Sequence, residues 1–441
     1  MRRSTMPHLD HLRLRTPSCG TPRVVSQVPN AKRCIIIPVV AQRCYATPTV
    51  RSAVLALSAT HLDFSIDPHC IDTVETRVAR GIGSLQLYNT AIAALRVYIE
   101  QNDKPSRADV LFSCAALVCC DLMRGDCGQA TKHVDHGSTL VRAWQQEVVC
   151  RPAGHRRDDE LEEIGEVFRA FDLHATTFDD SRLPLLAVSR KNGGVGSTLP
   201  VEFANLQQAQ RYLVQIQSAA LVDLIQSAPH KSKQMFEVPR HVIVRRRATR
   251  ASFQKWSSAL ACLETNVTRL SKMHSRKEQA ALCVFKIHHR ILQLLLEESF
   301  QEIDLRKPFD GAGDQLLLWA EQALKLRPAE RCFSVDVGLG PSLFLLVLKT
   351  TQISLRQRGT RFLACLQKLE GWHKPQAMLR AVNDLTIWES YEEAQLHDNG
   401  AKMALEQVAE QAGKYGSGVE RSSWLDASFV NNADAASTAA L

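Results

Sequence analysis

The chain has 441 residues, of which 45% are hydrophobic, enough to bury the core of one large or two moderate domains. Its thirteen cysteines are odd in number and lack a disulfide-like spacing, which favours a reducing compartment over a disulfide-stabilised secreted protein. The net charge of +8 comes from the first 51 residues, which hold nine basic side chains and one acidic one. The rest of the chain is neutral, so direct DNA binding by the body of the protein is not expected.

The two ends of the chain differ in composition from its body. Residues 1–45 are expected to be a disordered basic arm. Two other interpretations of this segment are a mitochondrial presequence, ending near Arg43-Cys44-Tyr45, and remnant or mispredicted sequence. Cleavage there would remove apolar residues that open the helical domain, which argues against a presequence. Residues 413–441, rich in Gly, Ser, Ala and Asn, are expected to be a disordered tail. Residues 46–412 form the predicted domain.

Three segments between residues 85 and 144 decide the fold class. The middle one, Val110 to Met123, offers water only Ser113 and Asp121, so it is predicted to be a central helix that other helices enclose, too short to span a membrane. Gly125 should end that helix, and Asp126 should cap the next one. In both flanking segments, apolar or small residues recur at steps of three and four, which predicts a helix with one buried face. In the segment before the central helix these residues are Leu85, Tyr88, Ile92, Leu95 and Ile99. In the segment after it they are Ala130, Val134, Gly137, Val141 and Trp144. The predicted class is all-α, an irregular superhelical arrangement of packed antiparallel helices.

Four consecutive blocks in this part of the sequence resemble a known family. They are ALSATHL (Ala56 to Leu62), YNTAIAAL (Tyr88 to Leu95), DLMRGD (Asp121 to Asp126) and ATKHVDHGSTLV (Ala130 to Val141). Together they resemble the regulatory region of fungal-specific zinc binuclear cluster transcription factors. Later segments also look like blocks of that family, namely Pro200 to Ile216, Phe333 to Lys349 and Leu379 to Glu389. The resemblance implies an α-helical domain that regulates transcription in the nucleus by binding a small effector or a protein partner.

The zinc module of that family has no counterpart in this sequence. Those factors carry an N-terminal DNA-binding module in which six cysteines, including C-x2-C pairs, hold two zinc ions. No C-x2-C spacing occurs here, and Cys19, Cys34 and Cys44 are too far apart to supply paired thiolates. Cys120 and Cys127 have no partner pair. Either the module is absent, or the gene model has lost the exon that encodes it.

The remainder of the chain is also predicted to be helical. The helical period indicates helices over the following ranges: Glu160 to Phe178, Leu206 to Gln226, Ser252 to Met273, Lys277 to Ser299, Asp314 to Leu326, Ser342 to Leu348, Ile353 to Leu369 and Pro375 to Gln395. The glycine-rich residues 191–197 are expected to form a surface loop. The basic cluster from Arg240 to Arg250 fits either a nuclear localisation signal or a solvated loop before the helix at Ser252.

Candidate chemistry-bearing residues do not assemble into a catalytic or metal-binding motif. His133 and His136 have a spacing that can chelate a metal, but no third ligand is recognisable. His288 and His289 point about 100° apart on a helix, and surface or capping roles are expected for them. Cys119 and Cys120 lie in an apolar helix, and thiols in apolar surroundings should be inert. We therefore predict no catalytic, cofactor-binding or metal-ligating residues, no cofactor and no enzymatic activity.

The function predicted from the sequence is a transcriptional regulator of the fungal-specific type that lacks a recognisable DNA-binding module. The expected partners are a DNA-binding transcription factor or a second copy of the chain, and a small-molecule effector is a further candidate. No membrane association is expected. The alternative is a helical scaffold or metabolite-binding protein that has no role in transcription.

Overall fold

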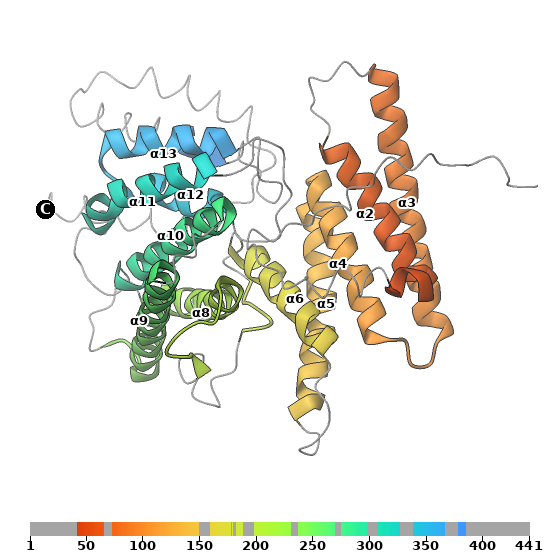
Figure 1. Ribbon diagram of the computed structural model, residues 1–441, viewed down its shortest axis with the longest axis horizontal. Coiled ribbons are helices and arrows are strands. Elements are labelled where there is room, and N and C mark those ends of the chain that lie inside the picture. Colours follow the sequence, from red (N-terminus) through yellow and green to blue (C-terminus); the bar gives the residue numbers. More distant parts are fainter. Residues whose placement is uncertain are drawn as a thin grey trace, which may run out of the picture.

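The computed structural model describes residues 42–65, 73–149, 159–177, 179, 182–187, 198–230, 237–269, 275–298, 307–326, 338–366 and 378–384. Every regular element in these ranges is a helix, which confirms the all-α class. The helices form two groups, α2 to α6 and α8 to α13 (Figure 1), and α6 packs against α8 where the groups meet. The expected basic arm lies outside the described residues except for its last four positions, and the expected tail lies wholly outside them.

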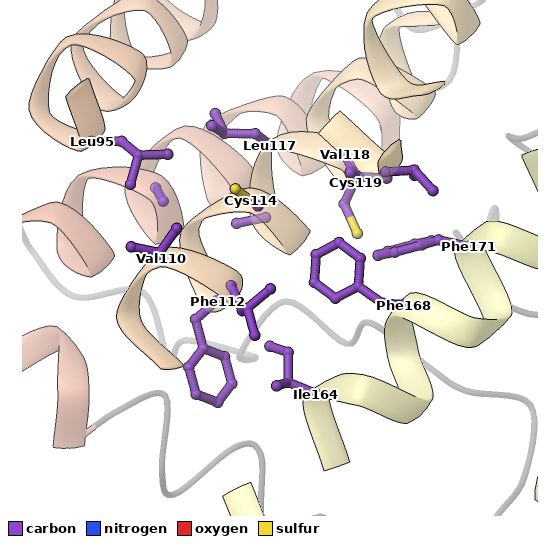
Figure 2. Close-up of a cluster of buried hydrophobic side chains, with 14 of the residues drawn as sticks. Leu95, Val110, Phe112, Cys114, Leu117, Val118, Cys119, Ile164, Phe168 and Phe171 are labelled. Atoms are coloured by element: carbon purple, nitrogen blue, oxygen red, sulfur yellow. The ribbon is translucent and has the colours of Figure 1, made fainter. Parts of the chain in front are cut away.

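The first group is built around one central helix, as predicted. It consists of α2 (Pro48–Ser65), α3 (Val74–Gln101), α4 (Arg107–Arg124), α5 (Cys127–Val149) and α6 (Asp159–Thr177). α4 contacts all four of the other helices. Leu111, Leu117 and Val118 are fully buried and belong to the same hydrophobic core as Phe168 and Phe171 of α6. Figure 2 shows the side chain of Cys119 of α4 pointing toward these two rings. The expectation that Ser113 and Asp121 face water is wrong, because both are buried in the contacts of α4 with its neighbours.

Local sequence sets both ends of α4. The Ser106 hydroxyl accepts a hydrogen bond from the Asp109 backbone N–H at 3.4 Å and caps the start of the helix. Gly125 ends it with φ = 75°, a left-handed conformation that only glycine adopts without strain. The Asp126 carboxylate then accepts from the Gln129 backbone N–H at 3.0 Å and caps α5. The predicted helix-helix corner is thus confirmed.

The buried face predicted for α3 is only partly right. Tyr88 and Leu95 are buried, whereas Leu85 and Ile99 are 49% and 44% exposed. α3 lies at the edge of the group (Figure 1) and packs mainly against α2 and α4, so its buried stripe is narrow. Small side chains complete that stripe, which consists of Ser84, Tyr88, Ala91 and Leu95. Ile92 and Tyr98 pack at the margin of the core, whereas Val78, Ile82, Leu87 and Val97 are exposed.

The face predicted for α5 is buried, and α5 and α6 approach closely. Gly137 of α5 makes this possible: a Cβ atom at that position would lie 2.0 Å from Cε1 of Phe168. Phe168 packs edge-on against Phe171, with ring centroids 5.8 Å apart. The predicted α5 residues, Ala130, Val134, Gly137, Val141 and Trp144, are all buried. Ile164 of α6 is also buried, and Val167 packs at the margin of the same core.

The second group contains two cores that share one helix. Its elements are α8 (Leu206–Ser227), η2 (Ala228–His230), α9 (Arg240–Arg269), α10 (Arg276–Glu298), α11 (Lys307–Leu326), α12 (Gly340–Lys349) and α13 (Ile353–Leu366). One face of α10, including Phe285, joins the core formed with α8 and α9. Another face, including Ile287 and Ile291, joins the core formed with α11 to α13. α10 therefore lies between two layers of helices (Figure 1).

The main correction to the predicted elements is the start of α9. The helix begins at Arg240, twelve residues before the predicted Ser252, so the basic cluster is helical and is not a loop. A buried stripe explains the early start, because Val242, Arg246 and Thr249 continue the helical spacing of Phe253. α11 also begins earlier than predicted, at Lys307. The predicted loop at 191–197 lies outside the described residues, as do the ends of the helices predicted to reach 369 and 395.

Candidate functional site

A buried polar cluster joins α3, α4 and α5 at the centre of the first group. Asp121 of α4 is 2% exposed and accepts a hydrogen bond from the Tyr88 hydroxyl of α3. The Arg124 guanidinium lies over the Tyr88 ring, 4.5 Å from its centroid, and donates to the Ser84 carbonyl at 2.8 Å. Nε2 of His133, from α5, lies 3.7 Å from Oδ2 of Asp121, which accepts no hydrogen bond from a described residue. The cluster thus holds one incompletely satisfied carboxylate.

The titration of this cluster follows from its burial. Burial raises the pKa of Asp121 to about 6, although the hydrogen bond from Tyr88 acts in the opposite direction. Burial, together with the neighbouring His136, lowers the pKa of His133. At pH 7 the cluster therefore holds a carboxylate beside a neutral imidazole. Its charge changes just below neutral pH, so the packing of α3, α4 and α5 is coupled to protonation.

The cysteines of α4 are buried thiols, as predicted. Burial raises the pKa of Cys114 and of Cys120 to about 11, and it also raises the pKa of Cys119. A thiol with so high a pKa is protonated at neutral pH and is a poor nucleophile. The prediction that Cys119 and Cys120 are inert is supported by these shifts.

The prediction that His288 and His289 have surface or capping roles is wrong. His133 is part of the polar cluster, whereas His136 is exposed. His288 is buried, and its Nε2–H donates to the Gly338 carbonyl at 2.9 Å. His289 donates from Nε2 to the Phe253 carbonyl at 3.1 Å and stacks on Trp256. Within the described ranges, no group of three His, Cys, Asp or Glu side chains is placed to hold a metal ion.

An arginine from the predicted basic arm belongs to the folded core. The guanidinium of Arg43 donates to Oδ1 of Asp109 at 2.5 Å and to Glu160, and it lies 5.6 Å from the centroid of the Phe112 ring. Asp109 also accepts hydrogen bonds from Thr47 and Tyr98. Arg43 therefore connects the start of the described chain to α4 and α6.

The basic cluster at the start of α9 is largely committed to structure. Arg246 is buried, and its Nε–H donates to the Leu296 carbonyl of α10 at 2.7 Å. Arg245 forms an ion pair with the buried Asp223 of α8 at 2.6 Å. Arg240, Arg247 and Arg250 are exposed. The sequence signal that could have placed Arg246 is its spacing of seven residues from Phe253, which puts both side chains on one face of the helix.

Comparison with known proteins finds a similarity that covers most of the first group of helices. Residues 22–169, about a third of the chain, match the family model of the fungal specific transcription factor domain. The matched range includes the four blocks on which the resemblance was first recognised, whereas the later blocks lie beyond it. Neither a curated protein nor a solved structure gives a significant match. No helix in the described part of the chain has the length and apolarity needed to cross a membrane.

Proposed function

Because residues 22–169 match the family model of the fungal specific transcription factor domain, we propose that the protein is a transcription regulator that acts in the nucleus by binding a protein partner. The family match carries the proposal, because neither the fold nor any single residue is specific to transcription. The same match argues for a non-enzymatic role, since domains of this family are regulatory.

The surface of the matched domain favours a protein partner over a small effector. Large apolar side chains on a protein surface are usually scattered, and their concentration marks an interaction site. Eight of the fifteen exposed large apolar side chains among the described residues lie on α2 and α3, namely Leu55, Leu62, Val78, Ile82, Leu85, Leu87, Val97 and Ile99. These two helices are therefore the proposed face for association.

The charge of the chain favours indirect rather than direct recognition of DNA. A protein gains affinity for DNA by neutralising several phosphates with a basic surface. Beyond residue 51 the acidic and basic side chains balance, and two arginines of the sharpest basic cluster contact Asp223 and the Leu296 carbonyl instead. The proposed route to a promoter is through a partner that itself binds DNA.

A tethering experiment tests this proposal. The full chain is fused to a heterologous DNA-binding module, and transcription from a reporter with matching sites is measured in fungal cells. We expect the fusion to change reporter output relative to the module alone, and the untethered protein to be enriched in nuclei. A Leu117→Asp variant, in which the core is disrupted, serves as the inactive control. An unchanged reporter together with exclusion from nuclei would contradict the proposal.

A binding experiment tests the indirect recognition of DNA. A fragment that begins at residue 42 removes most of the basic arm and keeps Arg43 with its partners Asp109 and Glu160. We expect this fragment to bind promoter fragments no more tightly than random DNA at physiological salt. Sequence-dependent nanomolar binding by the fragment would show that the helical body recognises DNA itself.

A further inference from the structure

The exposed side of α9 carries a basic stripe. Between Glu237 and Glu264 the chain has six Lys or Arg side chains and no acidic one, although the chain beyond residue 51 is neutral as a whole. Steps of three and four residues place one set of exposed side chains on a single face of the helix: Arg240, Val244, Arg247, Ala251 and Lys255. We call these five residues the α9 stripe.

The α9 stripe lies opposite the face that α9 buries. Its centre is about 180° around the helix axis from Val242, Phe253 and Trp256, which are all buried. On that buried side α9 packs mainly against α8 and α10, and it lies at the outer edge of the second group (Figure 1). The stripe therefore faces outward over a length of about 22 Å, at 1.5 Å of rise per residue.

The arginines of the stripe differ from the neighbouring arginines of α9 in what they contact. Arg245 forms an ion pair with Asp223 at 2.6 Å, and the Arg250 guanidinium lies 3.7 Å from a carboxylate of α10. No described residue forms an ion pair or a hydrogen bond with the side chain of Arg240 or Arg247. These two guanidinium groups lie two helical turns apart on one face, and a guanidinium binds a carboxylate through two parallel hydrogen bonds. The stripe is therefore suited to carboxylates on another molecule.

The composition of the stripe favours an acidic protein segment over nucleic acid. Val244 lies between Arg240 and Arg247 and is 55% exposed. A phosphate backbone offers nothing to cover this side chain, whereas an apolar side chain of a protein partner would remove it from water. The three basic residues of the stripe would also neutralise fewer phosphates than the roughly six to ten that DNA-binding proteins commonly contact.

We propose that the α9 stripe binds an acidic amphipathic segment of a partner protein. Carboxylates of the segment pair with Arg240, Arg247 and Lys255, and its apolar side chains cover Val244. The small side chain of Ala251 lets the segment approach the helix closely. Because exposed ion pairs are screened by salt, the binding should be weak and salt-dependent. The stripe lies outside residues 22–169, so the proposal goes beyond the proposed function and does not depend on it.

Titration of the full chain with a synthetic helical peptide tests the proposal. The peptide has about twenty residues, enough to cover the stripe, with glutamate and leucine alternating at steps of three and four along one face. The control peptide has glutamine in place of every glutamate. We expect the acidic peptide to bind at least about tenfold more tightly than the control, with a smaller preference at high salt. Equal binding of the two peptides, or no binding of the acidic one at about 1 mM, would overturn the proposal.

Charge reversal assigns the binding to the stripe. The double variant Arg240→Glu with Arg247→Glu should weaken binding of the acidic peptide at least about tenfold, because two attractions become two repulsions. The matched control is Arg142→Glu with Arg361→Glu, which reverses two exposed arginines of α5 and α13 and gives the same net charge. This control should stay within about twofold of the natural affinity. Equal effects of the two double variants would show that the stripe is not the binding surface.

A substitution at Val244 separates an acidic protein segment from nucleic acid. Val244→Ser removes the apolar contact and should weaken binding of the acidic peptide about threefold or more, while binding of a random-sequence DNA duplex stays unchanged. The control is Val201→Ser, at a position outside α9 that is 89% exposed. If reversal of Arg240 and Arg247 weakened binding of the duplex more than binding of the peptide, the stripe would be a nucleic-acid surface and the proposal would fail. Thermal melts of all variants check that the surface changes leave the fold intact.

Discussion

Helices α4 and α10 hold similar positions in the two groups of helices but are buried by different chemistry. α4 is almost wholly apolar and contacts four other helices. α10 lies between two cores yet carries Lys286, His288 and His289, each with a specific partner: Glu264, the Gly338 carbonyl and the Phe253 carbonyl. The comparison shows that a helix can be buried on two sides without an apolar sequence. What it needs is a partner for every polar group it encloses.

The largest effect should come from a charge placed in α4. Leu117 is fully buried, so Leu117→Asp encloses a carboxylate among apolar side chains and should cost several kcal/mol of unfolding free energy. Set against a total stability of about 5 to 15 kcal/mol, this predicts aggregation or a large fall in Tm. Val97→Asp, at an exposed apolar position of α3, is the control and should change Tm little. Equal melts for the two variants would refute the enclosure of α4.

In the second group, removal of a partnered charge should have the next largest effect. Arg246→Ala leaves the Leu296 carbonyl, and the Leu295 carbonyl at 3.4 Å, without their donor, and should cost about 2–3 kcal/mol. Arg247→Ala, one residue along and exposed, should stay within about 0.5 kcal/mol. Chemical denaturation of both variants measures the difference. This prediction replaces the interpretation of the basic cluster from Arg240 to Arg250 as a solvated loop.

A smaller effect should follow from added volume between α5 and α6. Gly137→Ala places a methyl group against the buried Phe168 ring, and the resulting overpacking should cost about 1–2 kcal/mol. Gly128→Ala in the same helix meets only the Asp126 side chain, at 3.7 Å, and should be neutral or stabilising because alanine favours helix. Opposite signs in thermal melts would confirm the close approach of the two helices.

A pH dependence of stability should come from the polar cluster of α3, α4 and α5. Because the folded pKa of Asp121 is raised from 3.8 to about 6, its contribution to stability is complete below the unfolded pKa and is lost as the pH rises through 6. Asp121→Asn should abolish this loss. The free energy of unfolding of the natural chain should therefore fall relative to that of the variant between pH 4 and pH 7. Parallel pH profiles would contradict the shift.

The effect of His133 has the opposite sign and provides a check. Its folded pKa is lowered, so it contributes stability above its unfolded pKa that is lost as the pH falls through the folded value. A loss of stability as the pH falls is therefore assigned to His133, and a loss as the pH rises is assigned to Asp121.

The sequence predicted the fold better than it predicted the polar interior. Apolar periodicity was enough for α4, for the α5 face and for the Gly125 corner, because each depends on side chains near in sequence. The hydrogen-bond partners of the buried residues Asp121 and Arg246 could not be predicted in the same way. Their partners come from other helices, Tyr88 and the Leu296 carbonyl, and sequence spacing within one helix says nothing of them. The outward side of α3 was missed because Leu85 and Ile99, which are exposed there, were assigned to the interior.

The contact between Arg43 and Glu160 also constrains the order in which the protein can fold. The two residues are 117 positions apart, and the core beneath them combines Ala53 of α2 with Phe168 of α6. During synthesis, α2 leaves the ribosome long before α6 exists, so the first group cannot close its core until nearly 180 residues have emerged. Contacts of such long sequence separation slow folding, because a long loop must be closed before they form. Until then, the apolar sides of α2 and α4 stay open to chaperones.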